Sequence, residues 1–426
     1  MFLKKILLNI LPKLIVYTFA LPLVLIIRLI APFIVIRWYC TQSTRIGHFC
    51  QNIQVYLAMK EEKKIFQSDR KFFDVFYNRT VICNNQLDKM WRRSNELFFL
   101  PNWFMDPINN VNEFILEKIF SSNNLHDIGY YYTPNKLLPG YAVPLNAVDH
   151  FNSTNESKIP IHFSNKEIIY GNKKLNEMGI NKNDNFVVLI LRSEDYLKTK
   201  YPKINWNVHS NRDTDIKYFM KTVKYLSKNN IKTILIGSGS PKNLDHKGLK
   251  IINYENSKYK SAFMDIFLFS LNNCKLVITS VTGIDAVGSL FKKPILEIGV
   301  VPFASARTYS KYYNFTLKKY FSKSLNRNLT MKEIFETGVA QVYGSQIPNE
   351  LEYKHPSEDE ILNSTIEILN KIDNKFISNN QDKELQNEFT EKYKKYIDKY
   401  FPERTCEKHF GKITESYISM NKYLLN

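Results

Sequence analysis

The stretch Lys275-Leu-Val-Ile-Thr279, followed by Ser280-Val-Thr-Gly-Ile-Asp-Ala286 and later by Pro294-Ile-Leu-Glu-Ile298, decides the fold. It contains a short apolar run with no polar face, a loop of hydroxyl residues and glycine, a helical pattern and a second apolar run. This order is typical of a buried strand, a loop, a helix and another buried strand. The stretch therefore predicts half of a nucleotide-binding fold.

The loop after Thr279 is the first candidate site. Backbone N–H groups and the hydroxyls of Ser280 and Thr282 would lie at a helix N-terminus, where the helix dipole favours an anion such as a diphosphate. The alternative is an ordinary turn, in which Thr282 caps the helix and Gly283 permits tight packing.

Two more apolar runs predict further strands of the same sheet. Residues 186–191 form a run that ends at Arg192, and residues 231–236 form a run that ends at Gly237. Alternation of such strands with helical patterns is typical of a parallel, doubly wound α/β sheet, whose ligands lie at the carboxyl ends of the strands. We therefore expect Arg192, Gly237 and the Ser280 loop at one edge.

An earlier α/β pattern predicts a first lobe. Strands are expected at 33–38, 72–77 and 97–100, and helices from about 46 to 59 and at 86–93. The stretch 101–165, rich in Asn, Pro and aromatic residues, is expected to form loops that face a cleft.

These patterns predict two Rossmann-like lobes with a cleft between them. The expected division is a membrane-associated segment 1–31, a first Rossmann-like lobe 32–165, a second Rossmann-like lobe 166–345, and helices 346–426 that pack back on the lobes. In that last part, residues 358–372 and 384–400 have the pattern of charged amphipathic helices.

The N-terminal segment is apolar. Residues 14–27 carry no charge, three lysines precede them and Arg28 follows. A spanning helix needs about 20 apolar residues, so the run is slightly short. We expect residues 1–31 to hold the protein at the cytoplasmic face of the inner membrane, as an uncleaved anchor or an interfacial insertion. A cleaved signal peptide and a buried helix are the alternatives.

The charge and cysteine content of the chain argue against several classes of function. The net charge of +18 is spread along the chain, and no Arg-rich stripe or basic motif interleaved with aromatic residues is present, so nucleic-acid binding is not expected. The five cysteines are scattered, without zinc spacing, which favours a reducing compartment. No metal or other cofactor is expected.

Arg192 is the strongest single candidate. An arginine at a strand end can bind a phosphate through two N–H groups, and Asp195 can hold that arginine or contact a sugar. A surface ion pair, with Asp195 capping the next helix, is the alternative.

Two further motifs have weaker signals. In Arg212-Asp-Thr-Asp215 the acids resemble a metal-binding pair. Capping of the helix at 216–226 by Asp213 or Thr214, with Asp215 complementing the helix dipole, explains them without metal, and Arg212 remains a candidate phosphate ligand. In Arg45-Ile-Gly47-His48, Gly47 allows close approach of a ligand, and His48 is a candidate general base for an acceptor hydroxyl.

In their order, these motifs resemble a family of bacterial GT-B-like glycosyltransferases of the surface-polysaccharide type, distantly similar to O-fucosyltransferases. The resemblance covers most of residues 40 to 320. It rests on Arg45-Ile-Gly-His48, Arg192-x-x-Asp195-Tyr196, Tyr201-Pro202, Arg212-Asp-x-Asp215, Phe263-Met-Asp265-Ile, Thr279-Ser-x-Thr-Gly283, Pro294 and Val301-Pro302.

The resemblance implies metal-independent transfer of a sugar from a nucleotide-sugar donor to a glycan or lipid-linked acceptor. Arg192, Asp195, Arg212, Gly237 and the Ser280 loop would bind the donor, with Arg192 also catalytic. His48, flanked by Arg45 and Gly47, would act on the acceptor. A nucleotide-sugar epimerase on the same fold and a non-enzymatic, membrane-tethered glycan-binding scaffold are the alternatives.

Overall fold

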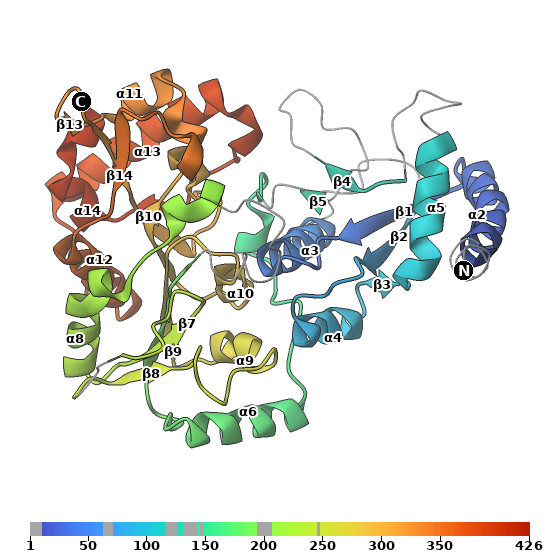
Figure 1. The fold of residues 1–426 in the computed structure, drawn as a ribbon, viewed down its shortest axis with the longest axis horizontal. Coiled ribbons are helices and arrows are strands. Elements are labelled where there is room, and N and C mark those ends of the chain that lie inside the picture. The colour runs from blue at the N-terminus through green and yellow to red at the C-terminus, as the bar shows by residue number, and fades with distance from the viewer. Residues whose placement is uncertain are drawn as a thin grey trace, which may run out of the picture. The chain divides into compact units, whose positions relative to one another are not determined.

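The computed structural model describes residues 11–62, 71–115, 126–130, 143–144, 148–193, 207–244 and 248–426. The chain forms two compact units, Met1–Ala147 and Val148–Asn426. Residues 148–165, which the sequence analysis assigns to the first lobe, are therefore part of the second unit. Both units are mixed α/β structures with parallel sheets (Figure 1).

The first unit is built on a parallel sheet of order β1-β2-β3. Residue Ile34 of β1 pairs with Lys71 of β2, and Val75 of β2 with Phe98 of β3. Its elements are β1 (Ile34–Thr41), α3 (Ile46–Glu61), β2 (Lys71–Asn78), α4 (Asn85–Arg93), β3 (Phe98–Phe99), β4 (Gly129–Tyr130) and β5 (Val143–Pro144). The strands and helices predicted between residues 33 and 100 are confirmed.

Two more helices of this unit pack against each other, α2 (Leu11–Ile30) and α5 (Asn102–Ile115). The expectation of loops in the stretch 101–165 is wrong for residues 102–115, which form α5 despite Pro107 within it. Met105, Ile108 and Ile115 of α5 are buried in one cluster with α2 and the sheet. This packing outweighs the weak helix propensity of an Asn- and Pro-rich sequence.

The second unit is built on a seven-stranded parallel sheet of order β15-β11-β10-β9-β6-β7-β8. Its strands are β6 (Phe186–Ile190), β7 (Lys232–Ile236), β8 (Ile251–Asn253), β9 (Cys274–Thr279), β10 (Ile295–Val300), β11 (Tyr313–Leu317) and β15 (Lys412–Ile413). The order reverses between β6 and β9. In such sheets this switch point is where ligands bind, outside the carboxyl ends of the strands.

Helices cover both faces of this sheet, so the doubly wound prediction is confirmed for the second unit (Figure 1). On one face, α8 (Met220–Lys228) and α12 (Glu358–Ile372) share a buried cluster with β6, β7, β9 and β10. On the other, α9 (Met264–Ser270) and α10 (Asp285–Leu290) pack closely, since a Cβ on Gly288 would lie 3.2 Å from Val277 Cγ2. Helix α6 (Asn165–Glu177) precedes β6.

The C-terminal part of the second unit carries a second core. Residues of α13 (Asn380–Tyr400) and α14 (Glu415–Met420) pack there against β11 and α11 (Met331–Glu336). An antiparallel sheet of order β13-β12-β14 adjoins it, with β12 (Lys319–Ser322), β13 (Arg327–Asn328) and β14 (Leu351–Lys354). Among the described residues, no helix is both long enough and apolar enough to cross a membrane.

Candidate functional site

The polar loops that follow β6 and β7 are tied to each other. The N–H of Ser193 donates to Ser238 Oγ at 3.2 Å, and the Ser238 hydroxyl donates to the Ser193 carbonyl at 2.9 Å. Gly237 adopts a φ of +97°, and a Cβ there would lie 2.4 Å from the Leu191 carbonyl oxygen. Only glycine fits this position without strain, so Gly237 shapes the loop and does not supply a side chain.

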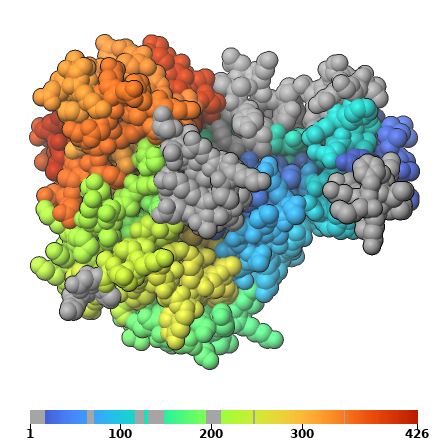
Figure 2. All heavy atoms as spheres, viewed as in Figure 1, coloured from blue at the N-terminus to red at the C-terminus, as the bar shows by residue number. Residues whose placement is uncertain are grey.

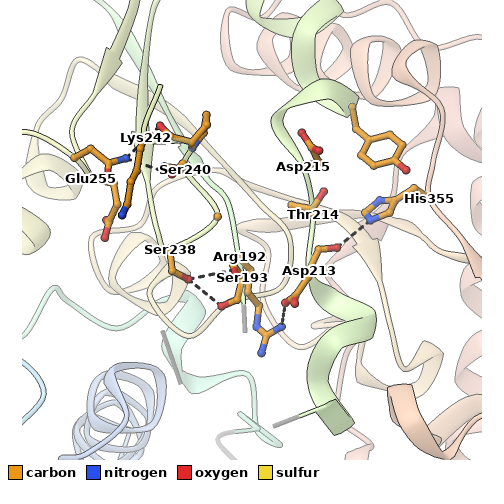
Figure 3. Close-up of a pocket in the computed structure, with 14 residues that line it drawn as sticks. Arg192, Ser193, Asp213, Thr214, Asp215, Ser238, Ser240, Lys242, Glu255 and His355 are labelled. Carbon is orange, nitrogen blue, oxygen red and sulfur yellow. Dashed lines mark hydrogen bonds and ion pairs between the residues drawn. The ribbon is translucent and has the colours of Figure 1, made fainter. Parts of the chain in front are cut away.

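These loops form one wall of a pocket of about 680 Å³ at the carboxyl ends of β6, β7 and β8. Figure 3 shows Arg192 between the serines of this wall and Asp213, which lies on the opposite wall with His355. The pocket lies beside the switch point of the sheet. Its lining residues are Arg192, Ser193, Asp213, Thr214, Asp215, Tyr218, Ser238, Gly239, Ser240, Pro241, Lys242, Glu255, Asn256 and His355.

Arg192 is fixed in this pocket by an ion pair with Asp213. The side chain of Arg192 is 9% exposed and that of Asp213 is 27% exposed. The prediction that Asp213 caps the helix beginning at residue 216 is therefore wrong. That role belongs to Asp215, whose carboxylate accepts the N–H of Lys217 at 2.9 Å. Thr214, the other predicted cap, lies beside Asp213 in the pocket wall.

Two more cations accompany Arg192. Arg212 is half-buried, and burial, then the nearby Arg192, lowers its pKa to about 10. Lys318 is 6% exposed and lies across Gly299, where a Cβ would be 3.2 Å from Lys318 Cγ. Burial lowers the pKa of Lys318 to about 8, with Asp213 raising it and Arg192 lowering it further. We call Arg192, Arg212 and Lys318 the basic cluster.

The three cations of the basic cluster lie near Asp213. Asp213 forms the ion pair with Arg192, and its charge raises the pKa of both Arg212 and Lys318. Buried charges are normally paired, because removing an ion from water is costly. Three neighbouring cations at one edge of the sheet are suited to a multiply charged anion.

His355 adds an aromatic surface to the same wall. Its ring stacks on Tyr218 with centroids 4.5 Å apart, and its Nε2 donates to the carbonyl of Asp213 at 3.1 Å. Burial, then the Lys318 charge, lowers the pKa of His355 to about 4. The imidazole is therefore neutral at pH 7 and adds no charge to the basic cluster.

The Ser280–Gly283 loop is held from behind by Asp285. The Asp285 carboxylate accepts the N–H of Thr282 at 3.2 Å, and the hydroxyls of Thr279 and Thr282 lie 3.1 Å apart. The N–H and hydroxyl of Thr282 thus have internal partners, in contrast to the open anion cradle suggested by the sequence. Helix α10 is also only six residues long, which weakens its dipole.

Two features of this loop remain unusual. Val281 has a φ of +57°, a conformation that costs energy for a β-branched residue and recurs at functional sites. The Ser280 hydroxyl is buried and has no hydrogen-bond partner within the described parts of the chain. The loop lies at the end of β9, next to β6, but does not line the pocket.

A buried ionic network supports the loop. Arg307 donates to Asp285 Oδ1 at 2.5 Å and to the Thr282 carbonyl at 3.3 Å, and it lies 3.3 Å from Glu297 Oε1. Both carboxylates are fully buried. Burial raises the pKa of Glu297 to about 8, with Arg307 lowering it and Asp285 raising it. Arg307 and Asp285 therefore act as scaffolding for the loop.

In the first unit, Arg45, Gly47 and His48 lie where β1 leads into α3. Arg45 is the exposed N-cap residue, and Gly47 and half-buried His48 form the first turn of the helix. The position of His48 after the first strand of a parallel sheet agrees with its predicted location. Asp195, with Tyr196 and Tyr201-Pro202, lies outside the described residues.

Several site residues were not found by sequence reasoning. Lys318, Glu255 and His355 belong to no motif. Glu255 and His355 line the pocket, and Lys318 lies near Asp213 and Arg192, because separate loops converge at the sheet edge. For Lys318, the sequence signal is a lysine directly after a strand, a pattern too common to indicate a site. Within the described ranges, no group of three or more His, Cys, Asp or Glu residues is arranged to hold a metal ion.

Two solved structures are similar to this chain. One is the ADP-heptose LPS heptosyltransferase II of E. coli, with a TM-score of 0.42 and 10% identity over 80% of this chain and 99% of its own. The other is a glycosyl transferase of family 9 from Veillonella parvula DSM 2008, with a TM-score of 0.45 and 11% identity over 80% of this chain and 97% of its own. No protein-family model and no curated protein matches the sequence. Both neighbours are glycosyltransferases, but at this similarity no residue role is transferred from them.

Proposed function

We propose that this protein is a GT-B-like glycosyltransferase that moves a sugar from a nucleotide-sugar donor to a hydroxyl of a glycan or lipid-linked acceptor in cell-surface polysaccharide synthesis. The observation that carries the proposal is the basic cluster around Asp213, at the switch point of a doubly wound sheet. A diphosphate is a multiply charged anion that three neighbouring cations can bind, and this edge is where such sheets bind nucleotides.

In the proposed reaction, the bond between the anomeric carbon and the diphosphate breaks, and negative charge develops on the departing nucleoside diphosphate. Arg192, Arg212 and Lys318 stabilise that charge in a partly buried site, where electrostatic interactions are stronger than in water. In this proposal the positive charge comes from the protein, so transfer needs no divalent metal. The Ser280–Gly283 loop flanks the donor from the β9 side.

His48 is the proposed base on the acceptor side. Its imidazole would take the proton of the acceptor hydroxyl while the hydroxyl oxygen forms the new bond to the anomeric carbon. The support is its place at the end of β1, in the first turn of α3. In the proposed reaction, the first unit binds the acceptor.

Mass spectrometry of reaction products tests the proposal. Purified full-length protein is given a panel of UDP-, GDP-, ADP- and CMP-sugars, with extracted membrane lipid as acceptor, with and without EDTA. Consumption of one donor with a glycosylated lipid product, unaffected by EDTA, is the expected result. An isomerised nucleotide sugar without acceptor would favour the epimerase, and no turnover or binding of any nucleotide would favour the scaffold.

A further inference from the structure

The outer side of helix α2 is apolar. Ala20, Val24 and Ile27 form its buried stripe, at the i, i+4, i+7 spacing of one helix face. The opposite side carries Leu25, Ile26 and Leu29. We define the apolar face of α2, including the residue three positions after the end of the helix, as Phe19, Leu25, Ile26, Leu29 and Phe33, which are 53% to 81% exposed.

Arg28, the one charged residue among residues 17–30 of α2, is turned inward. Arg28 donates from Nε at 3.1 Å and from Nη2 at 2.7 Å to Oδ1 of Asn112, which is fully buried on α5. The guanidinium is thereby held between the two helices. A helix on an ordinary protein surface has charged residues opposite its buried stripe, and α2 has none there among its described residues 17–30.

The neighbouring helix α5 also exposes two large aromatic side chains, next to the exposed polar residues Asn110 and Glu113. Trp103 and Phe114 are 67% and 61% exposed, and they lie on one side of α5, away from the buried Met105, Ile108 and Ile115. Figure 2 shows the atoms of α2 and α5 adjoining on the surface of the first unit. Exposed apolar surface on this scale is typical of an interaction site.

We propose that the apolar face of α2 inserts into the interface of a bilayer that contains anionic phospholipid, with the helix lying in the membrane plane. One stripe of α2 already packs against α5 and the sheet, so lipid cannot surround the helix as it would a spanning one. The charge of the chain suits an anionic surface, since Lys4, Lys5 and Lys13 precede the face and the net charge is +18.

Vesicle flotation of the full-length protein tests this surface. We expect the wild type to float with vesicles of phosphatidylcholine and phosphatidylglycerol, less with phosphatidylcholine alone, and less at high salt because ions screen the attraction. The double variant Leu25→Glu, Leu29→Glu removes two inserted side chains. It should lower the vesicle partition coefficient about tenfold or more.

The matched control is Ile169→Glu, Ile377→Glu. Both isoleucines are highly exposed in the second unit, at 70% and 92%, so this variant adds the same charge away from the apolar face. It should float like the wild type. Nucleoside diphosphate binding should be unchanged in both variants, which separates this inference from the proposed function.

Three results would overturn the inference. The wild type would not float with anionic vesicles, or Leu25→Glu, Leu29→Glu would float like the control. Alternatively, light scattering without lipid would show a stable dimer that this variant converts to monomers, which would make the apolar face a contact between two copies of the chain. The altered side chains are more than half exposed, and circular dichroism verifies that both variants are folded.

Discussion

Replacing Arg192 with alanine removes the cation that the structure fixes most firmly in the pocket. Arg192 is held by Asp213, so its guanidinium is oriented before an anion arrives. A hydrogen bond to a charged group contributes about 1.5 to 3 kcal/mol. We therefore expect the variant to bind the nucleoside diphosphate about 10- to 100-fold more weakly. The affinity of Arg192→Lys, which keeps the charge but loses the planar guanidinium, should lie between those of the wild type and Arg192→Ala.

Isothermal titration calorimetry measures this effect, with Arg327→Ala as the control. Arg327 pairs with Glu333 on the surface of the same unit and is 48% exposed, so its loss should leave nucleotide binding unchanged. Loss of the Arg192–Asp213 pair should also lower stability by about 1 to 2 kcal/mol, since Asp213 remains partly hydrated. Equal affinity of Arg192→Ala and wild type for every nucleotide that binds would refute the assignment of Arg192 to the anion.

Four further predictions concern single residues. Because the pKa of Lys318 is about 8, diphosphate affinity should fall as pH rises from 7 to 9 and the ammonium loses its proton, and Lys318→Arg should flatten that profile in calorimetric titrations. Glu297 has a pKa raised by burial to about 8 from an ordinary 4.5, so its contribution to stability is present below pH 4.5 and is lost as pH rises towards 8. The melting temperature of Glu297→Gln should accordingly rise relative to the wild type between pH 5 and pH 8, and a constant difference would contradict the buried-carboxylate interpretation. His48→Gln should lower kcat about 100-fold or more while the donor Kd stays unchanged, which steady-state kinetics and calorimetry together check. Gly237→Ala should destabilise the protein by about 1 to 3 kcal/mol in denaturant unfolding, since its φ is +97° and the new Cβ would meet the Leu191 carbonyl.

The sheet of the second unit was largely predictable from the sequence. Strands β6, β7, β9 and β10 are buried on both faces, so they appear as short continuous apolar runs. Arg192 and Gly237 each follow one of these strands, and the carboxyl ends of parallel strands meet at one edge, so their shared location could be inferred. The antiparallel strands β12 to β14 were not predicted, because their sequences have no such runs.

The helix at 102–115 and the role of Asp213 show where local patterns are insufficient. Helix α5 is stabilised by burial against α2, which propensity does not report, and Pro107 indicates a loop. Asp213, Thr214 and Asp215 all have capping chemistry, and only the backbone geometry determines that Asp215 caps. Asp213 is then available to Arg192, a residue 21 positions away in the chain.

Part of the candidate site was predictable because some of its residues directly follow recognisable strands. Arg192 and Gly237 follow recognisable strands, so their shared edge could be inferred. Lys318 and His355 come from loops after β11 and β14, and no motif links them to Arg192. The Ser280–Gly283 loop was located correctly at the end of β9, but the sequence could not show that Asp285 and Arg307 occupy its polar groups.

Binding of nucleoside diphosphates to the full-length protein tests the central claim most directly. Calorimetric titration with UDP, GDP, ADP and CDP, and with the matching monophosphates, compares ligands that differ by one phosphate. We predict that one diphosphate binds at least tenfold more tightly than its monophosphate, and that Lys318→Ala and Arg192→Ala each remove most of that difference. Absence of binding by every diphosphate, or binding that neither substitution weakens, would contradict the assignment of the basic cluster to a nucleotide-sugar donor.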